Sequence, residues 1–300
     1  MANVTLDQIK ELREKTQVGM MDCKKALIEA AGDMEKAIEI LRKKGAAVAA
    51  KRAGKEALHG RIEAYISDDD KIGCLVKLNT ETDFSANTED AKKFTQELAK
   101  HIVKANPMYI EGEDNNALLN QKLDARNLTV KECLNELVAK ITENIKIGDF
   151  ARFEIKENGL INTYIHPGST LATLIELETD NPVELDKTSG QQIKQLAHDI
   201  CMQIAVTNPI SIDPSQVPHE TLEKERKIAR EQLLESGKPE NIIDKILEGK
   251  MRKFFEEVCL IEQPFIKDDK TKIKQFIEKV EKETGTKIKI KQFKRFAIGQ

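Results

Sequence analysis

The chain contains the segment Gly60-Arg61-Ile62-Glu63-Ala64-Tyr65-Ile66 and, 99 residues later, the matching segment Gly159-Leu160-Ile161-Asn162-Thr163-Tyr164-Ile165. Each segment is followed by a run of alternating apolar residues, and the two runs keep the same offset. The first run consists of Ile72, Cys74, Val76 and Leu78, and the second of Leu171, Thr173, Ile175 and Leu177. Because a period of two is typical of β-strands, the chain is predicted to contain two copies of a strand pair.

A helix is expected after each strand pair. The apolar face of the first, with Thr88 as its N-cap candidate, matches that of the second at an offset of 102 residues, which predicts a second strand-to-helix loop three residues longer. An Asn-Pro pair ends both helices, at residues 106–107 and 208–209. The matching residues of the two faces are Ala91, Phe94, Leu98 and Ile102, and then Ile193, Leu196, Ile200 and Ile204.

A third match has an offset of 143 residues and completes each repeat as strand, strand, helix, helix, strand. It pairs Val130, Leu134 and Leu137 with Ile273, Ile277 and Val280, and the run Phe150–Ile155 with Phe293–Ile298. The second repeat therefore contains about 41 extra residues between its helices.

The extra residues predict a helical hairpin. Residues 214–236 are strongly charged, and Gly237-Lys238-Pro239 interrupts them. The apolar residues that follow are spaced three or four apart, as on one face of a helix: Ile243, Leu247, Met251, Phe254 and Val258. The hairpin is expected to project from the body. It is the best candidate for self-association, as a homodimer or a heterotetramer with a partner, or for another partner contact.

Three short helices are predicted ahead of the repeats. The second starts near Met20-Met21, and Gly32-Asp33 separates it from the third, which is expected to end at Gly45. Small bundles of this kind usually bind a partner. The two methionines fit either the core or an adaptable contact surface.

The predicted class is α+β, with an N-terminal three-helix bundle followed by two repeats of a three-stranded antiparallel sheet with helices. The expected divisions are a bundle at 1–45, a helical linker at 46–56, a first repeat at 57–156, a second repeat at 157–213 and 259–300, and an inserted coiled-coil-like hairpin at 214–258.

Composition indicates a soluble, helix-rich protein of about two domains. The 300 residues carry a net charge of only −3, with 48 basic and 51 acidic groups, which argues against a surface built for nucleic acid. No apolar run is long enough for a membrane span, and Met1-Ala2-Asn3 does not begin a secretory signal. The five cysteines have no Cys-x-x-Cys pair, and we expect them buried in a reducing cytoplasm.

No pattern for catalysis stands out. The five histidines are scattered and the chain lacks a phosphate-binding glycine-rich loop, so we expect no enzyme activity, metal or cofactor. The alternating basic residues of the last strand fit a solvated sheet edge better than a nucleic-acid contact. They are Lys287, Lys289, Lys291, Lys294 and Arg295.

The polar loop Thr80-Glu81-Thr82-Asp83-Phe84-Ser85-Ala86-Asn87 is the leading functional candidate. It joins a predicted strand to a predicted helix and carries one large aromatic residue. Phe84 could serve a contact, or it could tuck under its own loop. The local pattern leaves both interpretations open.

Two motifs resemble signatures of translation elongation factor Ts. The run from Leu12 to Leu27 is similar to the family's N-terminal signature, which forms a ubiquitin-associated-like domain. The run Leu78–Asn87 is similar to its second signature, with Ser85 in place of a Val and Lys77 in place of a common Glu. The family's Ile-Gly-Glu-Asn run appears as Ile141-Thr142-Glu143-Asn144, and Glu262-Gln263-Pro264-Phe265 matches the segment after the hairpin.

The resemblance implies a guanine nucleotide exchange factor that releases GDP from elongation factor Tu, without contacting nucleic acid or membrane. The loop residues Thr82, Asp83, Phe84 and Ser85 would then disturb the partner's magnesium site. Other implied partner contacts are Val18, Gly19, Met20, Met21, Lys24, Ile141, Thr142 and His166. The alternative is a binding scaffold that uses the bundle and the hairpin and has no effect on nucleotide.

Overall fold

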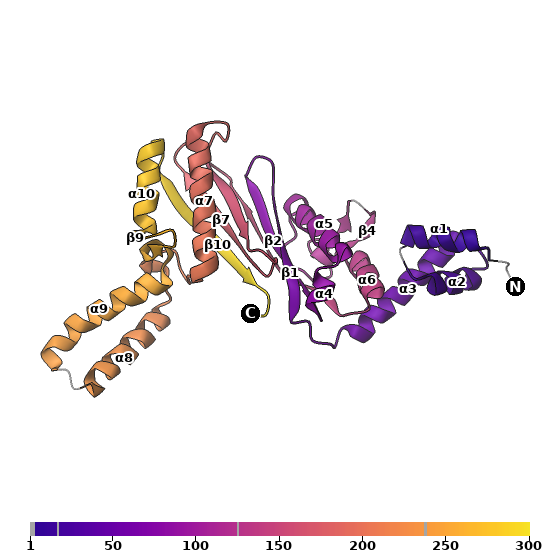
Figure 1. Ribbon diagram of the computed structural model, residues 1–300, viewed down its shortest axis with the longest axis horizontal. Helices are drawn as coiled ribbons and strands as arrows, with labels where there is room; N and C mark the ends of the chain where they lie inside the picture. The colour runs from indigo at the N-terminus through magenta and orange to yellow at the C-terminus, as the bar shows by residue number, and fades with distance from the viewer. Residues whose placement is uncertain (1–3, 17, 125, 237–238) are drawn as a thin grey trace.

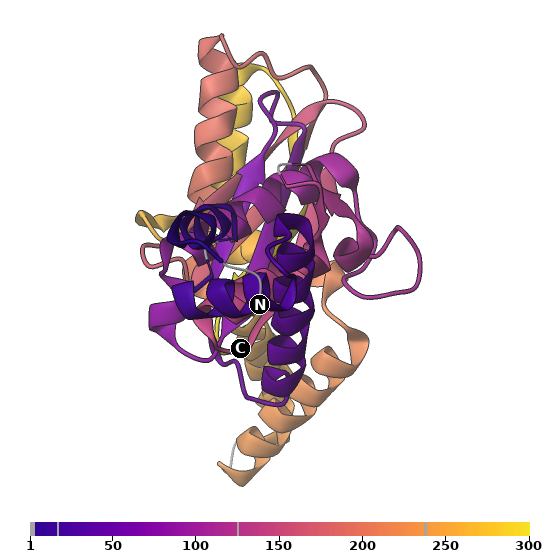
Figure 2. The same ribbon diagram turned by 90° about the vertical axis from the view of Figure 1, so that its right-hand side faces the viewer.

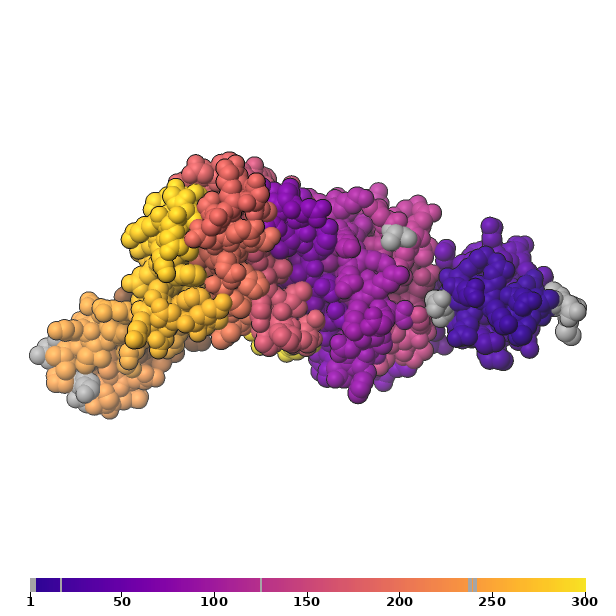
Figure 3. Space-filling model, turned by 45° about the horizontal axis from the view of Figure 1, so that its top comes forward, coloured from indigo at the N-terminus to yellow at the C-terminus, as the bar shows by residue number. Residues whose placement is uncertain are grey.

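The computed structural model of the protein describes residues 4–16, 18–124, 126–236 and 239–300. Its helices and antiparallel sheets confirm the predicted α+β class. The molecule is elongated, with the N-terminal helices at one end, a projecting helix pair at the other and two sheets between them (Figures 1 and 3).

The first sheet has the strand order β1-β2-β5, and all its pairings are antiparallel. Two long helices, α5 and α6, cover one face, where Val76, Phe94 and Leu98 are buried together. Thr88 caps α5 as predicted, since its side chain accepts a hydrogen bond from the Ala91 N–H. The elements are β1 (His59–Ile66), β2 (Ile72–Thr80), α4 (Asp83–Ala86), α5 (Glu89–Ala105), η1 (Leu118–Asn120), β3 (Lys122–Leu123), β4 (Leu128–Thr129), α6 (Val130–Ile141) and β5 (Ile145–Glu154).

The second sheet has the order β10-β7-β6, also antiparallel, with α7 and α10 packed on one face. β10 lies at the sheet edge with Lys289 and Lys291 exposed, as the sequence predicts. The elements are β6 (Gly159–Ile165), β7 (Leu171–Thr179), α7 (Thr188–Thr207), η3 (Leu260–Glu262), β8 (Pro264–Phe265), β9 (Asp268–Lys272), α10 (Ile273–Thr284) and β10 (Ile288–Ala297).

The two sheets bury their remaining faces against each other. This shared cluster contains Ile62, Leu75, Phe153, Ile161, Leu174 and Phe296. Backbone hydrogen bonds also join the halves, because the Ile62 N–H donates to the Ser169 carbonyl at 2.7 Å and the Ile161 N–H to the Asp70 carbonyl at 2.8 Å. The sheets therefore form the centre of the molecule, with helices outside.

The glycine that opens each matching segment is required by the backbone. Gly60 has φ +153° and Gly159 has φ +143°. A Cβ would lie 2.2 Å from the Leu78 carbonyl oxygen at the first position and 1.9 Å from the Leu177 carbonyl oxygen at the second. Only glycine permits this approach of the first strand to the second.

The prediction of a longer second strand-to-helix loop is wrong. Residues 81–88 separate β2 from α5 and residues 180–187 separate β7 from α7, so the two connections are equally long. The second connection closes a turn of its own, in which the Lys187 N–H donates to the Glu184 carbonyl at 3.0 Å. The three added residues therefore lengthen α7 at its start.

The N-terminal bundle consists of α1 (Leu6–Thr16), α2 (Met20–Glu29) and α3 (Met34–Arg52), packed around a small core that contains Leu12, Cys23 and Leu27. Asp33 caps α3 by accepting hydrogen bonds from Glu35 N–H at 3.0 Å and Lys36 N–H at 3.1 Å.

The prediction that this third helix ends at Gly45 is wrong, because the segment 46–56, expected as a helical linker, begins as a continuation of the same helix. Helix α3 continues to Arg52. Gly45 is buried where α3 meets α6, and a Cβ there would lie 3.4 Å from the Ala139 Cβ and 3.5 Å from the Asn135 carbonyl oxygen. The missing side chain lets two helices approach closely instead of ending one, so a continuous helix connects the bundle to the first sheet.

The inserted segment forms η2 (Pro214–Gln216), α8 (His219–Glu235) and α9 (Glu240–Val258), which extend away from the sheets (Figure 2). Three of the predicted apolar residues, Ile243, Leu247 and Met251, are buried against Ala229 and Leu233 of α8. The predicted break at Gly237-Lys238 lies outside the described residues.

Replacing residues 214–257 with a short Gly/Ser link should leave both sheets folded. The hairpin buries its own core, and the segments at its base meet directly, since the Leu260 N–H donates to the Ser211 carbonyl at 3.0 Å. Thermal denaturation should show one cooperative transition, displaced by about 2–4 °C for each kcal/mol lost. Loss of cooperative melting would contradict independent folding of the sheets.

Light scattering on the same variant tests whether the hairpin mediates self-association. If it does, the variant should have a smaller molecular mass in solution than the wild-type protein.

All five cysteines are free and buried, as predicted. Burial raises the pKa of the Cys74 and Cys201 thiols to about 12, so both stay protonated at neutral pH. Within the described residues, no group of three His, Cys, Asp or Glu side chains could hold a metal ion.

Candidate functional site

The loop after β2 contains one turn of helix, α4, which presents Phe84 to solvent. The Phe84 residue is 83% exposed, so the interpretation in which it tucks under its own loop is wrong. Thr82 is the N-cap of α4, and its side chain accepts a hydrogen bond from the Ser85 N–H at 3.3 Å. A side-chain cap thus stabilises the turn, while the aromatic ring that it carries remains exposed to solvent.

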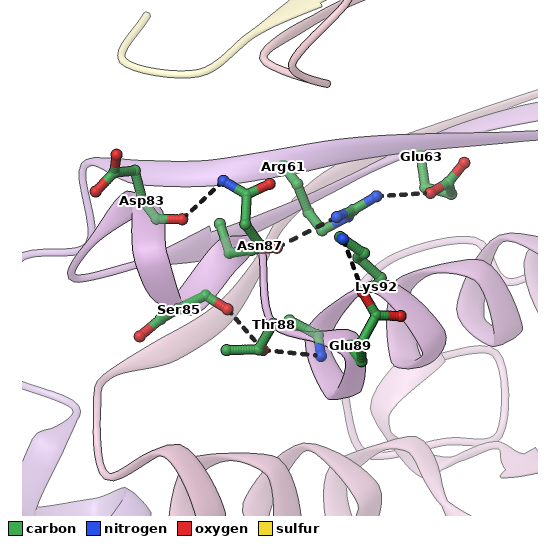
Figure 4. A network of polar contacts seen from close by, with 10 residues as sticks. Arg61, Glu63, Asp83, Ser85, Asn87, Thr88, Glu89 and Lys92 are labelled. Carbon is green, nitrogen blue, oxygen red and sulfur yellow. Dashed lines mark hydrogen bonds and ion pairs between the residues drawn. The ribbon is translucent and has the colours of Figure 1, made fainter.

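The loop rests on Arg61 of β1. This arginine is only 6% exposed, and its guanidinium donates to the Ala86 carbonyl at 3.3 Å and to the Glu63 carboxylate at 3.0 Å (Figure 4). Ser85 is 5% exposed, and its hydroxyl lies 3.2 Å from the Thr82 hydroxyl. Ser85 was predicted to contact a partner, but its burial suits it to supporting the turn instead.

The Asp83 side chain is exposed beside Phe84. Its Oδ1 accepts a hydrogen bond from the Phe84 N–H at 3.0 Å, and its backbone carbonyl accepts one from the Asn87 side chain at 2.9 Å. In Figure 4 the carboxylate points away from the other labelled side chains. It can still accept hydrogen bonds from an approaching molecule or compete for groups around a cation.

The loop is tied to the end of α6 by two carboxylates. Glu143 accepts hydrogen bonds from the Thr82 N–H at 3.1 Å and from the Thr82 hydroxyl at 2.9 Å. In return, Glu81 accepts one from the Asn144 N–H at 2.6 Å. We call the four residues Glu81, Thr82, Glu143 and Asn144 the carboxylate clasp. It joins two predicted contact segments, Thr82–Ser85 and Ile141-Thr142, and sequence reasoning assigned its Glu143 no role.

Thr142 has a strained backbone at the end of α6. It is the C-cap of the helix with φ +63°, in the left-handed region, and its N–H donates to the Val138 carbonyl. Glycine is the usual residue at such a cap because a Cβ is unfavourable there. This explains why the family pattern has Gly at this position, which Thr142 occupies here.

Thr142→Gly should raise the free energy of unfolding by up to about 1 kcal/mol, because it removes this strain. Thermal denaturation measures the change, with Thr129→Gly as the control. Thr129 is the N-cap of α6 in a complete capping box, so its loss should destabilise the protein. A lower melting temperature for Thr142→Gly would show that the threonine side chain stabilises the protein by more than the strain of its positive φ destabilises it.

The predicted N-terminal contacts surround the start of α2. Gly19, Met20, Met21 and Lys24 are exposed, whereas Val18 packs partly against the bundle core. Met20 is 40% and Met21 is 65% exposed, so the interpretation that places this pair in the core is wrong. The opposite side of α2 supplies the buried residues Cys23, Ala26 and Leu27.

His166 lies in the turn between β6 and β7, and its side chain is exposed. Its Nδ1 lies 2.9 Å from the Tyr164 hydroxyl, while His198 of α7 meets the same tyrosine ring edge-on with centroids 5.8 Å apart. Two of the five histidines therefore flank one tyrosine ring, a contact between β6 and α7 that their spacing in the sequence does not indicate.

Two of the predicted contact segments meet at β1. Arg61 binds the Ala86 carbonyl under the Phe84 loop, and the next residue, Ile62, donates its N–H to Ser169 in the turn that contains His166. The start of α2 lies apart from them, at the end of the molecule (Figure 1). The structure is thus an elongated α+β fold in which the Phe84 loop and the His166 turn both contact β1, while the start of α2 lies at a distance from them.

Comparison with known proteins identifies the family. The family model described as "Elongation factor TS" matches residues 81–300. Elongation factor Ts of Clostridium perfringens (strain SM101 / Type A) is 44% identical over 299 residues, covering 99% of this chain and 93% of that protein. Elongation factor Ts of Aquifex aeolicus (strain VF5) is 41% identical, covering 99% and 98%. Elongation factor Ts of Prosthecochloris aestuarii is 41% identical over the full length of both. The chain belongs to the elongation factor Ts family, which gives it a role in translation elongation.

Helices long and apolar enough to cross a membrane are absent from the described parts of the chain.

Met20→Ala combined with Met21→Ala should weaken partner binding about tenfold or more without lowering the melting temperature. Each buried Met side chain is worth about 1.5–3 kcal/mol at a contact, whereas exposed ones contribute little to folding. Isothermal titration with elongation factor Tu measures the effect. Met108→Ala is the matched control, because Met108 is a 74% exposed methionine outside the bundle. Unchanged affinity of the double variant would contradict a docking role for the bundle.

Proposed function

We propose that this protein is a guanine nucleotide exchange factor for elongation factor Tu, promoting GDP release during translation elongation. The observation that carries the proposal is the exposure of Phe84. This residue is 83% exposed on a turn that Thr82 caps and that Arg61 binds through the Ala86 carbonyl. A large aromatic side chain presented in this way gains apolar contact only when a partner covers it.

The physical account needs no catalytic group. A GTPase holds GDP through phosphate contacts and a magnesium ion, so an exchange factor needs only to bind the nucleotide-free geometry more tightly. Phe84 would insert between elements of the partner, while Asp83 would disturb the groups that position the magnesium ion. By thermodynamic reciprocity, GDP must then weaken the binding of the exchange factor by the same factor.

The remaining predicted residues become secondary contacts in this proposal. Val18, Gly19, Met20, Met21 and Lys24 would dock the partner's nucleotide domain. Ile141 and Thr142 would extend the contact beside the Phe84 loop, and His166 would hold another part of the partner. The elongated shape supports contacts with several parts of one partner at once.

We further propose that the two sheet-and-helix units, 57–156 and 157–213 with 259–300, are repeats of one ancestral unit. Both have a central second strand and two covering helices. The N-terminal bundle would be of the ubiquitin-associated type, and the hairpin a coiled-coil-like device for self-association. The protein would act in the cytoplasm without a cofactor of its own.

Calorimetric titration of elongation factor Tu, with and without bound GDP, tests the proposal. Exchange activity predicts an affinity for the nucleotide-free form about 5–150-fold higher than for the GDP form. The scaffold alternative predicts equal affinities. Equal affinities would therefore contradict nucleotide exchange while leaving partner binding intact.

A further inference from the structure

We propose that Glu143 is a positioning residue for nucleotide exchange, holding the turn that presents Phe84 in the orientation that a partner meets. The inference rests on the proposed function. In this inference the carboxylate clasp fixes the conformation of the loop that contains Phe84 before a partner binds.

The turn needs an external anchor because it cannot fix itself. Helix α4 has only four residues, and a single isolated helical turn is unstable in water. Phe84 is almost fully exposed, so packing of its ring contributes little to holding the turn. The orientation of Phe84 must therefore come from groups at the two ends of α4.

Thr82 holds the start of α4 and Arg61 holds its end. Arg61 is itself fixed, because it is buried and paired with Glu63 at 3.0 Å. Thr82 is an N-cap that already uses its hydroxyl oxygen as an acceptor for the Ser85 N–H. Its own N–H and hydroxyl proton both have the Glu143 carboxylate as partner, at 3.1 and 2.9 Å. Such charge-assisted bonds are stronger than neutral ones.

The backbone around Glu143 is itself restrained by hydrogen bonds of the next residue, Asn144. The neighbouring Asn144 is 6% exposed, and its amide donates to the Lys55 carbonyl at 2.5 Å. The Asn144 N–H donates to Glu81, the residue before Thr82, which closes the clasp from the other side. The positive φ of Thr142 turns the chain at the end of α6 directly before Glu143. These contacts fix the position of the segment that carries Glu143, and its bonds to Thr82 then restrict the Phe84 turn. Preorganisation of this kind lowers the entropy lost on binding.

The experiment measures GDP release from elongation factor Tu at saturating exchange factor for Glu143→Ala and Glu143→Gln. Both changes are made in the wild-type protein and in the Phe84→Ala background. We expect Glu143→Ala to slow release about tenfold. Glu143→Gln should restore part of the rate, because its amide oxygen can still accept the Thr82 N–H. Glu113→Ala is the control, since Glu113 is an exposed carboxylate with no hydrogen bond or ion pair to any residue the structure describes, and it should behave as wild type.

The Phe84→Ala background separates positioning from a general structural role. If Glu143 acts through the orientation of Phe84, Glu143→Ala should cause little further loss once the ring is absent. An equal loss in both backgrounds would overturn the inference. Should Glu143→Ala melt at a much lower temperature, the same comparison is made with Glu143→Gln.

The outcomes also distinguish this inference from the function on which it rests. Wild-type acceleration together with a wild-type rate for Glu143→Ala would overturn the positioning role and leave the exchange function standing. No acceleration by the wild-type protein would overturn both.

Discussion

Phe84→Ala should lower the maximal rate of GDP release about ten- to hundredfold and leave the melting temperature nearly unchanged. A buried aromatic side chain is worth about 1.5–3 kcal/mol at an interface, and each 1.4 kcal/mol is about tenfold in rate or affinity. The exposed ring contributes little to the folded state by itself. Stopped-flow release of fluorescent GDP and thermal denaturation measure the two quantities.

Two control variants distinguish a contact role of Phe84 from a role in packing. Met108→Ala removes a 74% exposed apolar side chain away from the loop and should change neither rate nor stability. Phe94→Ala removes a ring that is 1% exposed in the first core, where such a loss costs about 3–5 kcal/mol of stability. If Phe84→Ala melted like Phe94→Ala, the ring would be a packing residue rather than a contact.

Asp83→Ala should also slow GDP release, about tenfold, and the deficit should shrink when magnesium is chelated. In the proposed mechanism the Asp83 carboxylate weakens the magnesium site, and a chelator achieves the same effect by another route. Its bond to the Phe84 N–H is local to an exposed turn, so the loss of stability should be about 1 kcal/mol or less.

Asp83→Asn is the matched control for charge, because the amide can still accept the Phe84 N–H. It should resemble Asp83→Ala in exchange and the wild type in stability. A deficit that chelation does not change would indicate that Asp83 only caps its own turn.

The sequence was sufficient for the parts of the fold that depend on local pattern. Alternation in Ile72–Leu78 marks β2, and Thr88 is visible as a helix cap before α5. The need for glycine at Gly60 and Gly159 follows from pairing with the next strand, and it appears in the sequence as the start of both matching segments.

The features that sequence reasoning missed depend on contacts between distant segments. Gly45 resembles a helix end, but it allows α3 and α6 to approach closely, and that requires knowing that Ala139 lies opposite. The bond between Thr82 and Glu143 joins residues 61 positions apart, so neither local sequence predicts it. The exposure of Phe84 likewise depends on the support that Arg61 provides from β1.

The rate of GDP release from elongation factor Tu, followed by stopped flow with increasing amounts of this protein, tests the central claim most directly. The account predicts that the rate rises with concentration and saturates, and that the Phe84→Ala protein reaches a much lower plateau. A release rate that stays at its intrinsic value, while the protein binds elongation factor Tu, would contradict it.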